Sequence, residues 1–378
     1  MDAATVQKLR DKMPVCQNWA YFDHAAVAPL PLPAQAAITE WATDVANNGD
    51  ANWSRWRKRV EEVRKLAAER IGAERSELAI IRNTTEGIGL IAEGLDWQPG
   101  DNVIVPTGEF PSNLLPWWNL QSRGVELRLL PTTNDQFELD ELDQLIDDRT
   151  GLVSLSWVGF ATGWRHDLQE IADLAHQRGS LLFVDAIQGL GVLELDLRNT
   201  PVDFLAADGH KWMLGPEGAG VLFIRNNRLN ELRPLGLGWN SVNNAGNYDA
   251  PNFELRSSAA RYEGGTYNMA GIHAFGASLE FLARFDISQI SQRLADVTTQ
   301  LCQHLEQAGF SIASSRTPTQ TSGIVSVEVP GIDLKALVAK CKEAGVVVNA
   351  RQGRLRLSPH IYTSEEDIAC LVECLTKN

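Results

Sequence analysis

Three short apolar runs that follow one another in the middle of the chain constrain its fold more than any other feature. They occupy residues 181–184, 202–207 and 221–224, and glycine, proline or charged residues close each of them. Continuous apolar runs with such boundaries are typical of strands that are buried on both faces. Open α/β sheets bind ligands at the carboxyl ends of their strands, so the polar residues after these runs are the candidate site.

Two ionisable residues follow two of these runs. Asp185 closes the first, and Lys211 lies in the DGHKW segment at 208–212 after the second. A lysine amine can hold an aldehyde cofactor as a Schiff base. A carboxylate beside a pyridine nitrogen keeps that nitrogen protonated. Taken alone, Asp185 fits a helix cap and Lys211 a solvated surface lysine, but the pair in this setting favours a cofactor site.

The VDAIQ segment at 184–188 and the DGHKW segment together resemble the class V aminotransferase family of pyridoxal 5'-phosphate (PLP) enzymes. This family includes cysteine desulfurases, selenocysteine lyases, kynureninases and isopenicillin N epimerase. The resemblance implies that Lys211 forms the Schiff base and that Asp185 contacts the ring nitrogen. It also implies that Gln188 bonds the ring hydroxyl and that His210 contacts the phosphate.

Three further motifs support the resemblance. In RNTTEG at 82–87 a hydroxyl-rich turn opens a helix, whose free N–H groups favour an anion. The resemblance implies that Thr84 and Thr85 contact the PLP phosphate; taken alone, a threonine here fits an ordinary helix cap. In EFPSN at 109–113, Phe110 takes the place of a ring-stacking histidine but cannot relay protons; a buried core phenylalanine is the alternative. In RYEGGT at 261–266, the resemblance implies that Thr266 reaches the phosphate of the other subunit, and hence a homodimer with shared active sites.

The expected substrate is a small molecule, an amino acid whose identity the sequence does not fix. An arginine can bond both oxygens of its carboxylate, and the resemblance selects Arg356, with Arg351 as the second candidate. Arg354 fits a solvated surface. His24, in the YFDHAA segment at 21–26, either touches substrate or is a loop histidine without a role.

The resemblance implies an α/β protein with the PLP-dependent transferase fold of the aspartate aminotransferase type, fold type I. We expect a large PLP-binding domain with a mostly parallel sheet at 26–270, and a small α+β domain from 1–25 and 271–378. Strands are expected at 78–81, 102–105, 125–130, 152–158, 323–329 and 346–349, and helices at 34–45, 54–71, 139–146, 168–178, 271–285, 290–308 and 334–344.

Composition excludes several classes of partner. The formal net charge of −14 argues against nucleic acid and anionic membranes. The uncharged stretch at 151–164 is too short to cross a bilayer, and the charged N-terminus lacks an apolar signal core. The five cysteines form no CxxC pair and no zinc set, so we expect no metal and a reducing cytoplasm.

The sequence predicts a PLP-dependent enzyme that acts on an amino acid, with a class V aminotransferase as the first choice. The alternative is a lyase of the cysteine desulfurase, selenocysteine lyase or kynureninase type that lacks a catalytic loop cysteine. The VVVNARQGRLR run at 346–356 contains no cysteine, and Cys341 lies on the preceding helix. A PLP-binding regulator without turnover is disfavoured, because base, cofactor and carboxylate-binding residues are all present. Transamination, elimination and racemisation stay open.

Overall fold

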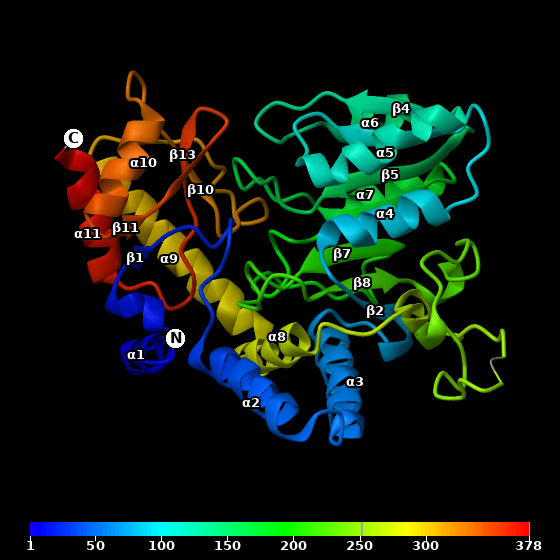
Figure 1. Cartoon of the computed structure of the whole chain (residues 1–378). Coiled ribbons are helices and arrows are strands. Elements are labelled where there is room, and N and C mark those ends of the chain that lie inside the picture. Colours follow the sequence, from blue (N-terminus) through cyan, green and yellow to red (C-terminus); the bar gives the residue numbers. More distant parts are fainter. Residues whose placement is uncertain (251, 378) are drawn as a thin grey trace.

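The computed structural model describes residues 1–250 and 252–377 and places a seven-stranded sheet beside a four-stranded sheet, with a short two-stranded sheet in addition (Figure 1). The larger sheet has seven strands in the order β2-β8-β7-β6-β5-β3-β4. All neighbouring pairs are parallel except the two that involve β8, which is antiparallel to both β2 and β7. The strands are β2 (Leu78–Ile81), β3 (Asn102–Pro106), β4 (Glu126–Leu130), β5 (Thr150–Ser156), β6 (Leu181–Asp185), β7 (Phe204–Asp208) and β8 (Gly220–Ile224).

This sheet is buried on both faces, as its apolar runs predict. Along β6, Leu182 and Val184 pack into one hydrophobic cluster and Phe183 into another, because successive side chains point to opposite faces. The helices within and around this part of the chain are α2 (Leu32–Asn48), α3 (Trp53–Arg70), α4 (Thr84–Gly94), α5 (Leu115–Asn119), α6 (Leu139–Leu145), α7 (Leu168–Gln177) and α8 (Met269–Leu282).

The smaller sheet has four antiparallel strands in the order β12-β13-β10-β9, with its own hydrophobic cluster. Helix α9 runs from this sheet toward α8 (Figure 1). The elements are α1 (Ala3–Arg10), β1 (Ala20–Tyr21), α9 (Ile287–Gln307), β9 (Ser311–Ile312), β10 (Val325–Glu328), α10 (Leu334–Glu343), β11 (Val346–Val347), β12 (Asn349–Arg351), β13 (Arg354–Leu357) and α11 (Glu365–Thr376).

The strand expected at 346–349 is divided in the structure. Its first part, β11, pairs in parallel with β1 near the N-terminus, whereas β12 pairs with β13. The chain thus changes partners at the buried Val348. This pairing ties the N-terminal segment to the C-terminal part. The domain division at residue 270 stays a prediction, and it falls inside α8, which packs against α2 and α3.

Candidate active site

A cavity of about 250 Å³ lies at the carboxyl ends of the parallel strands. Ser156, Asp185 and Asp208 end the adjacent strands β5, β6 and β7 and face it together. This is the edge at which α/β sheets bind ligands. The cavity brings together nine of the eleven predicted site residues: Thr84, Thr85, Phe110, Asp185, Gln188, His210, Lys211, Arg351 and Arg356.

Burial changes the ionisation of both residues expected to do the chemistry. It lowers the pKa of Lys211 to about 8, although the carboxylates of Asp185 and Asp208 oppose the shift. Burial likewise raises the pKa of Asp185 to about 6, against a backbone hydrogen bond from Ile187 N at 3.0 Å. A lysine with so low a pKa has a much larger neutral fraction near physiological pH than an ordinary lysine, and a nucleophile or general base needs the neutral amine.

The turn that carries Lys211 is tightly constrained. Gly209 leaves no room for a side chain, because a Cβ there would lie 2.7 Å from the Ala219 carbonyl oxygen. Buried Leu214 adopts a left-handed φ of 56°, and its N–H donates to the Lys211 carbonyl at 3.0 Å. Ser278 Oγ on α8 donates to the Leu214 carbonyl at 2.7 Å. Strain of this kind persists only where the surroundings enforce it, so this turn holds Lys211 in one place.

The amide of Gln188 is oriented by two hydrogen bonds. Trp212 Nε1 donates to its Oε1 at 2.9 Å, and its Nε2 donates to the Ala25 carbonyl at 3.0 Å. Trp212 follows Lys211 directly in the chain, so its hydrogen bond to Gln188 fixes the position of Gln188 relative to Lys211.

The first turn of α4 closes one end of the cavity. Asn83 caps the helix, accepting a hydrogen bond from Glu86 N. Thr84 Oγ1 accepts from Asp208 N at 2.9 Å, and Thr85 Oγ1 donates to Ser112 Oγ at 2.8 Å. A helix N-terminus with adjacent hydroxyl groups is suited to an anion such as a phosphate.

Phe110 stands over the lysine amine. Lys211 Nζ lies 5.8 Å from the centroid of its ring, which is 44% exposed. Phe160 packs edge-on against Phe110, with ring centroids 5.5 Å apart. A half-exposed ring beside the amine is available to cover a flat cofactor, unlike a buried core phenylalanine.

Arg356 is 2% exposed and is held by two acceptors. Its Nη1 donates to the Phe160 carbonyl at 2.9 Å, and its Nη2 donates to Asp23 Oδ1 at 3.2 Å. Its buried Nε has no hydrogen-bond partner in the described structure. A buried donor without a partner costs free energy, so an anionic ligand that accepts from it would be stabilised. Arg351 lines the same cavity and donates to Asn349 Oδ1 at 2.6 Å.

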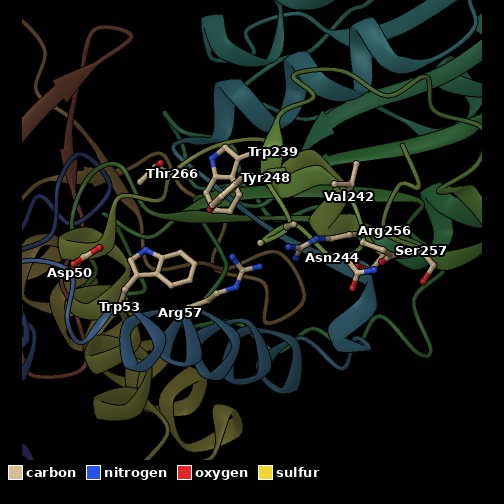
Figure 2. A pocket seen from close by; sticks show the side chains of 14 residues that line it. Asp50, Trp53, Arg57, Trp239, Val242, Asn244, Tyr248, Arg256, Ser257 and Thr266 are labelled. Atoms are coloured by element: carbon tan, nitrogen blue, oxygen red, sulfur yellow. The ribbon is translucent and has the colours of Figure 1, made fainter. Parts of the chain in front are cut away.

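Two predicted residues do not line this cavity. His24 is fully buried; its Nδ1 lies 2.8 Å from the Ser358 carbonyl and its Nε2 lies 2.6 Å from the Tyr362 hydroxyl. Thr266 instead lines a separate, open pocket together with Trp53, Arg57 and Trp239 (Figure 2).

Sequence reasoning missed other lining residues, among them Ser156, Phe160 and Ser112. Ser156 ends the observed strand β5, whereas the sequence predicted a strand that continued to residue 158, so the strand end was not located at Ser156. Phe160 lies in an irregular loop and gave none.

The cavity fits PLP. It offers an amine and a carboxylate together, a helix N-terminus for the phosphate and an unsatisfied guanidinium for a carboxylate. The sequence profile of the Aminotransferase class-V family matches residues 20–371.

Relatives and solved structures agree with that match. A probable cysteine desulfurase of Methanothermobacter thermautotrophicus is 31% identical, over 98% of this chain and 97% of its own. The cystine C–S lyase C-DES, solved with glycine covalently linked to its PLP cofactor, superimposes with a TM-score of 0.92 at 25% identity, over 97% of this chain and 98% of its own. An uncharacterized aminotransferase, YcbU of Bacillus subtilis, is 25% identical, over 96% of this chain and 95% of its own. The expected fold type I and PLP cofactor are confirmed.

Proposed function

Because this chain belongs to the class V aminotransferase family and is a PLP-dependent enzyme, we propose that it is a lyase that breaks the carbon–sulfur bond of a cysteine-derived amino acid without a cysteine nucleophile. The observation that carries this proposal is the β12–β13 hairpin. Gln352 and Gly353 turn it in two residues, with left-handed φ values of 47° and 76°. Such a turn holds no cysteine-bearing loop, and no cysteine is among the described residues that line the cavity.

Cys341 is unsuited to the nucleophile's role. It is fully buried on α10, and its Sγ lies 3.5 Å from Sγ of Cys374 on α11. Burial raises the pKa of the Cys341 thiol to about 12, so the reactive thiolate is disfavoured.

C-DES supports the proposal by its chemistry. It was solved in complex with its reaction product, cysteine persulfide, and it superimposes on this chain with a TM-score of 0.91 at 26% identity. Several relatives of this chain are named cysteine desulfurases, so sulfur-containing amino acids are the common substrate class.

PLP, when bound, supplies an electron sink for the carbanion at the substrate α-carbon. The chain's residues prepare that step. The neutral amine of Lys211 accepts the α-proton. The Asp185 carboxyl holds a proton at the ring nitrogen, and Arg356 orients the substrate carboxylate through its guanidinium. Phe110 covers the ring and limits the access of water.

An aminotransferase, the first choice from the sequence, is the second candidate. Two uncharacterized aminotransferases among the relatives favour it. Both candidates need Lys211, Asp185 and Arg356, and they differ in the fate of the carbanion.

We further propose a homodimer in which Thr266 contacts the phosphate held by the partner subunit. In support, Thr266 lies outside the Lys211 cavity and lines an open pocket beside exposed Tyr248 (Figure 2).

No helix among the described residues is long and apolar enough to span a bilayer. We propose the cytoplasm as its compartment, since five cysteines in 378 residues, with no CxxC pair, are typical of proteins from a reducing environment.

A scan of amino acids against the visible spectrum of the PLP-loaded protein tests the proposed substrate class. Cystine or cysteine should change the spectrum transiently, and the starting spectrum should return once the substrate is consumed. A lasting change with alanine or glutamate, and none with sulfur-containing amino acids, would contradict it.

A further inference from the structure

Glu109 has no role in the chemistry described so far, yet its carboxylate is bound to a wall of the active-site cavity. Its Oε1 accepts a hydrogen bond from Ser156 N at 2.6 Å, and its Oε2 accepts one from Ser156 Oγ at 2.5 Å. Both carboxylate oxygens are therefore engaged by one residue at the end of β5.

Ser156 separates Glu109 from the cavity. On one side Ser156 lines the cavity, and in the sheet it is paired in register with Asp185. On the other side Ser156 and Glu109 line a small adjoining space with Phe160. The hydroxyl of Ser156 is therefore a hydrogen-bonded link between the Glu109 carboxyl and the cavity.

No cation among the described residues that line this adjoining space neutralises Glu109. The titratable groups that face it are Asp135, His166 and, at the end of the neighbouring strand β6, Asp185. Asp135 is bound by Thr162 through its N–H and hydroxyl, at 2.9 and 2.6 Å. Burial lowers the pKa of His166 to about 4, so this imidazole is neutral.

The protonated form of Glu109 is accessible as a result. Burial raises its pKa to about 7, and the Asp185 carboxylate adds to this, against the hydrogen bonds from Ser156 and from the side chain of Asn113. An ionised carboxylate only accepts hydrogen bonds, whereas a carboxylic acid also donates one. The ionised form therefore accepts the Ser156 hydroxyl proton, and the acid donates to Ser156 Oγ and frees that proton.

We propose that Glu109 is a positioning residue that sets the direction of the Ser156 hydroxyl by gaining or losing one proton. When Glu109 is ionised, its carboxylate holds the Ser156 hydroxyl hydrogen away from the cavity. Ser156 Oγ then faces the cavity as a hydrogen-bond acceptor. The acid, after taking a proton from water, turns the hydroxyl into a donor toward the cavity. Phe110, which also lines the cavity, cannot relay protons. The Glu109–Ser156 pair instead supplies, beside Asp185, a hydroxyl whose direction depends on a proton.

Infrared difference spectra of the apo protein test the proton on Glu109 itself. Between pH values of about 6 and about 8, the absorption of protonated carboxyls should fall in the wild type, and the part of this change with a midpoint near 7 should be lost in Glu109→Gln, which keeps only the part from Asp185, whose pKa is about 6. The matched control is Asp135→Asn, at a neighbouring carboxylate whose left-handed φ of 65° asparagine tolerates. The control should keep the change.

The visible spectrum of the PLP-loaded protein tests the effect on the cavity, without substrate. A titration step near pH 7 should appear in the wild type and Asp135→Asn, and vanish in both Glu109→Gln and Ser156→Ala. Ser156→Ala keeps the backbone bond to Glu109 and serves if Glu109→Gln does not fold. An unchanged step in Ser156→Ala, or an unchanged infrared signal in Glu109→Gln, would overturn the inference. Neither readout depends on which bond of the substrate breaks.

Discussion

The Lys211 cavity and the Thr266 pocket are built from different kinds of structure. The Lys211 cavity, about 250 Å³, is formed by strand ends, the first turn of α4 and the β12–β13 hairpin. The Thr266 pocket, about 1080 Å³, is lined mainly by residues within 239–248 and by 256–258, outside the sheets, with Trp53 and Arg57 from α3 (Figure 2). Sheet hydrogen bonds fix strand ends, whereas a loop depends on its side chains.

The charged side chains of the two regions also lie in different environments. In the cavity, burial lowers the pKa of Lys211 to about 8 and raises that of Asp185 to about 6. In the pocket, the Arg57 guanidinium lies over Trp53 and Trp239, with its Cζ 5.3 and 5.9 Å from their ring centroids. The comparison teaches that enclosure, which shifts the pKa values, suits the cavity to chemistry. Half-buried rings and a cation suit the pocket to contact with another surface.

The largest effect is expected for Lys211→Ala. Without the amine, the protein should bind PLP only noncovalently, and turnover should be abolished because the α-proton has no base. Borohydride treatment followed by peptide mapping should show PLP fixed to Lys211 in the wild type and to no peptide in the variant. Exchange of the exposed Lys65 for alanine is the control and should keep the label. A label on another lysine in the wild type would refute the assignment.

Arg356→Ala should raise KM for the amino acid on the order of 10²-fold, because a buried, hydrogen-bonded charge pair to substrate contributes about 2–5 kcal/mol. PLP occupancy should stay close to that of the wild type. Arg356→Lys, which keeps the charge but loses the planar guanidinium, should fall between the two. Equal KM values in all three enzymes would move the carboxylate site elsewhere, with Arg351 as the next candidate.

The enclosure of the cavity predicts an unusually reactive lysine in the apo protein. Since the Lys211 pKa is lowered to about 8, its neutral fraction rises as pH increases through 8, and an amine-directed reagent should modify it with that midpoint. At neutral pH it should react about 10²-fold faster than an exposed lysine of pKa near 10.4. In Asp185→Asn the midpoint should fall further, because the Asp185 carboxylate stabilises the ammonium form. A midpoint near 10 would mean that the cavity does not enclose the amine.

The smallest of these effects concerns the other region. Thr266→Val should weaken PLP retention by a few-fold, about 1 kcal/mol for one lost hydrogen bond, in the dimer. Thr266→Ser keeps the hydroxyl and should retain PLP like the wild type. A strictly monomeric protein with full PLP occupancy in sedimentation would contradict a contribution from the partner.

The sequence was sufficient to place the elements that carry the cavity. The strands ending at Asp185 and Asp208 are continuous apolar runs because both of their faces are buried, and such runs are readable without partners. Thr84 begins helix α4, shortly after the strand β2 ends. The sequence itself marks this boundary, because Asn83 is a typical helix-capping residue.

Contacts between residues that are far apart in the sequence could not be predicted from local sequence patterns. His24 turns inward because Ser358 and Tyr362, more than 300 residues away, supply its hydrogen-bond partners. Arg356 is held by Asp23 and by the Phe160 carbonyl, which the loop after β5 brings near. No spacing in the sequence reports such pairings, since the packing of the two sheets creates them.

The most direct test of the central claim is the ratio of pyruvate formed to active sites when the PLP-loaded Cys341→Ser enzyme is given cystine and no keto-acid acceptor. A lyase that needs no cysteine should release pyruvate and ammonia over many turnovers, at the wild-type rate, and leave its cofactor unchanged. One equivalent of keto acid with lasting conversion of the cofactor would identify an aminotransferase instead. Loss of turnover in Cys341→Ser with PLP still bound would contradict the claim that this enzyme works without a cysteine nucleophile.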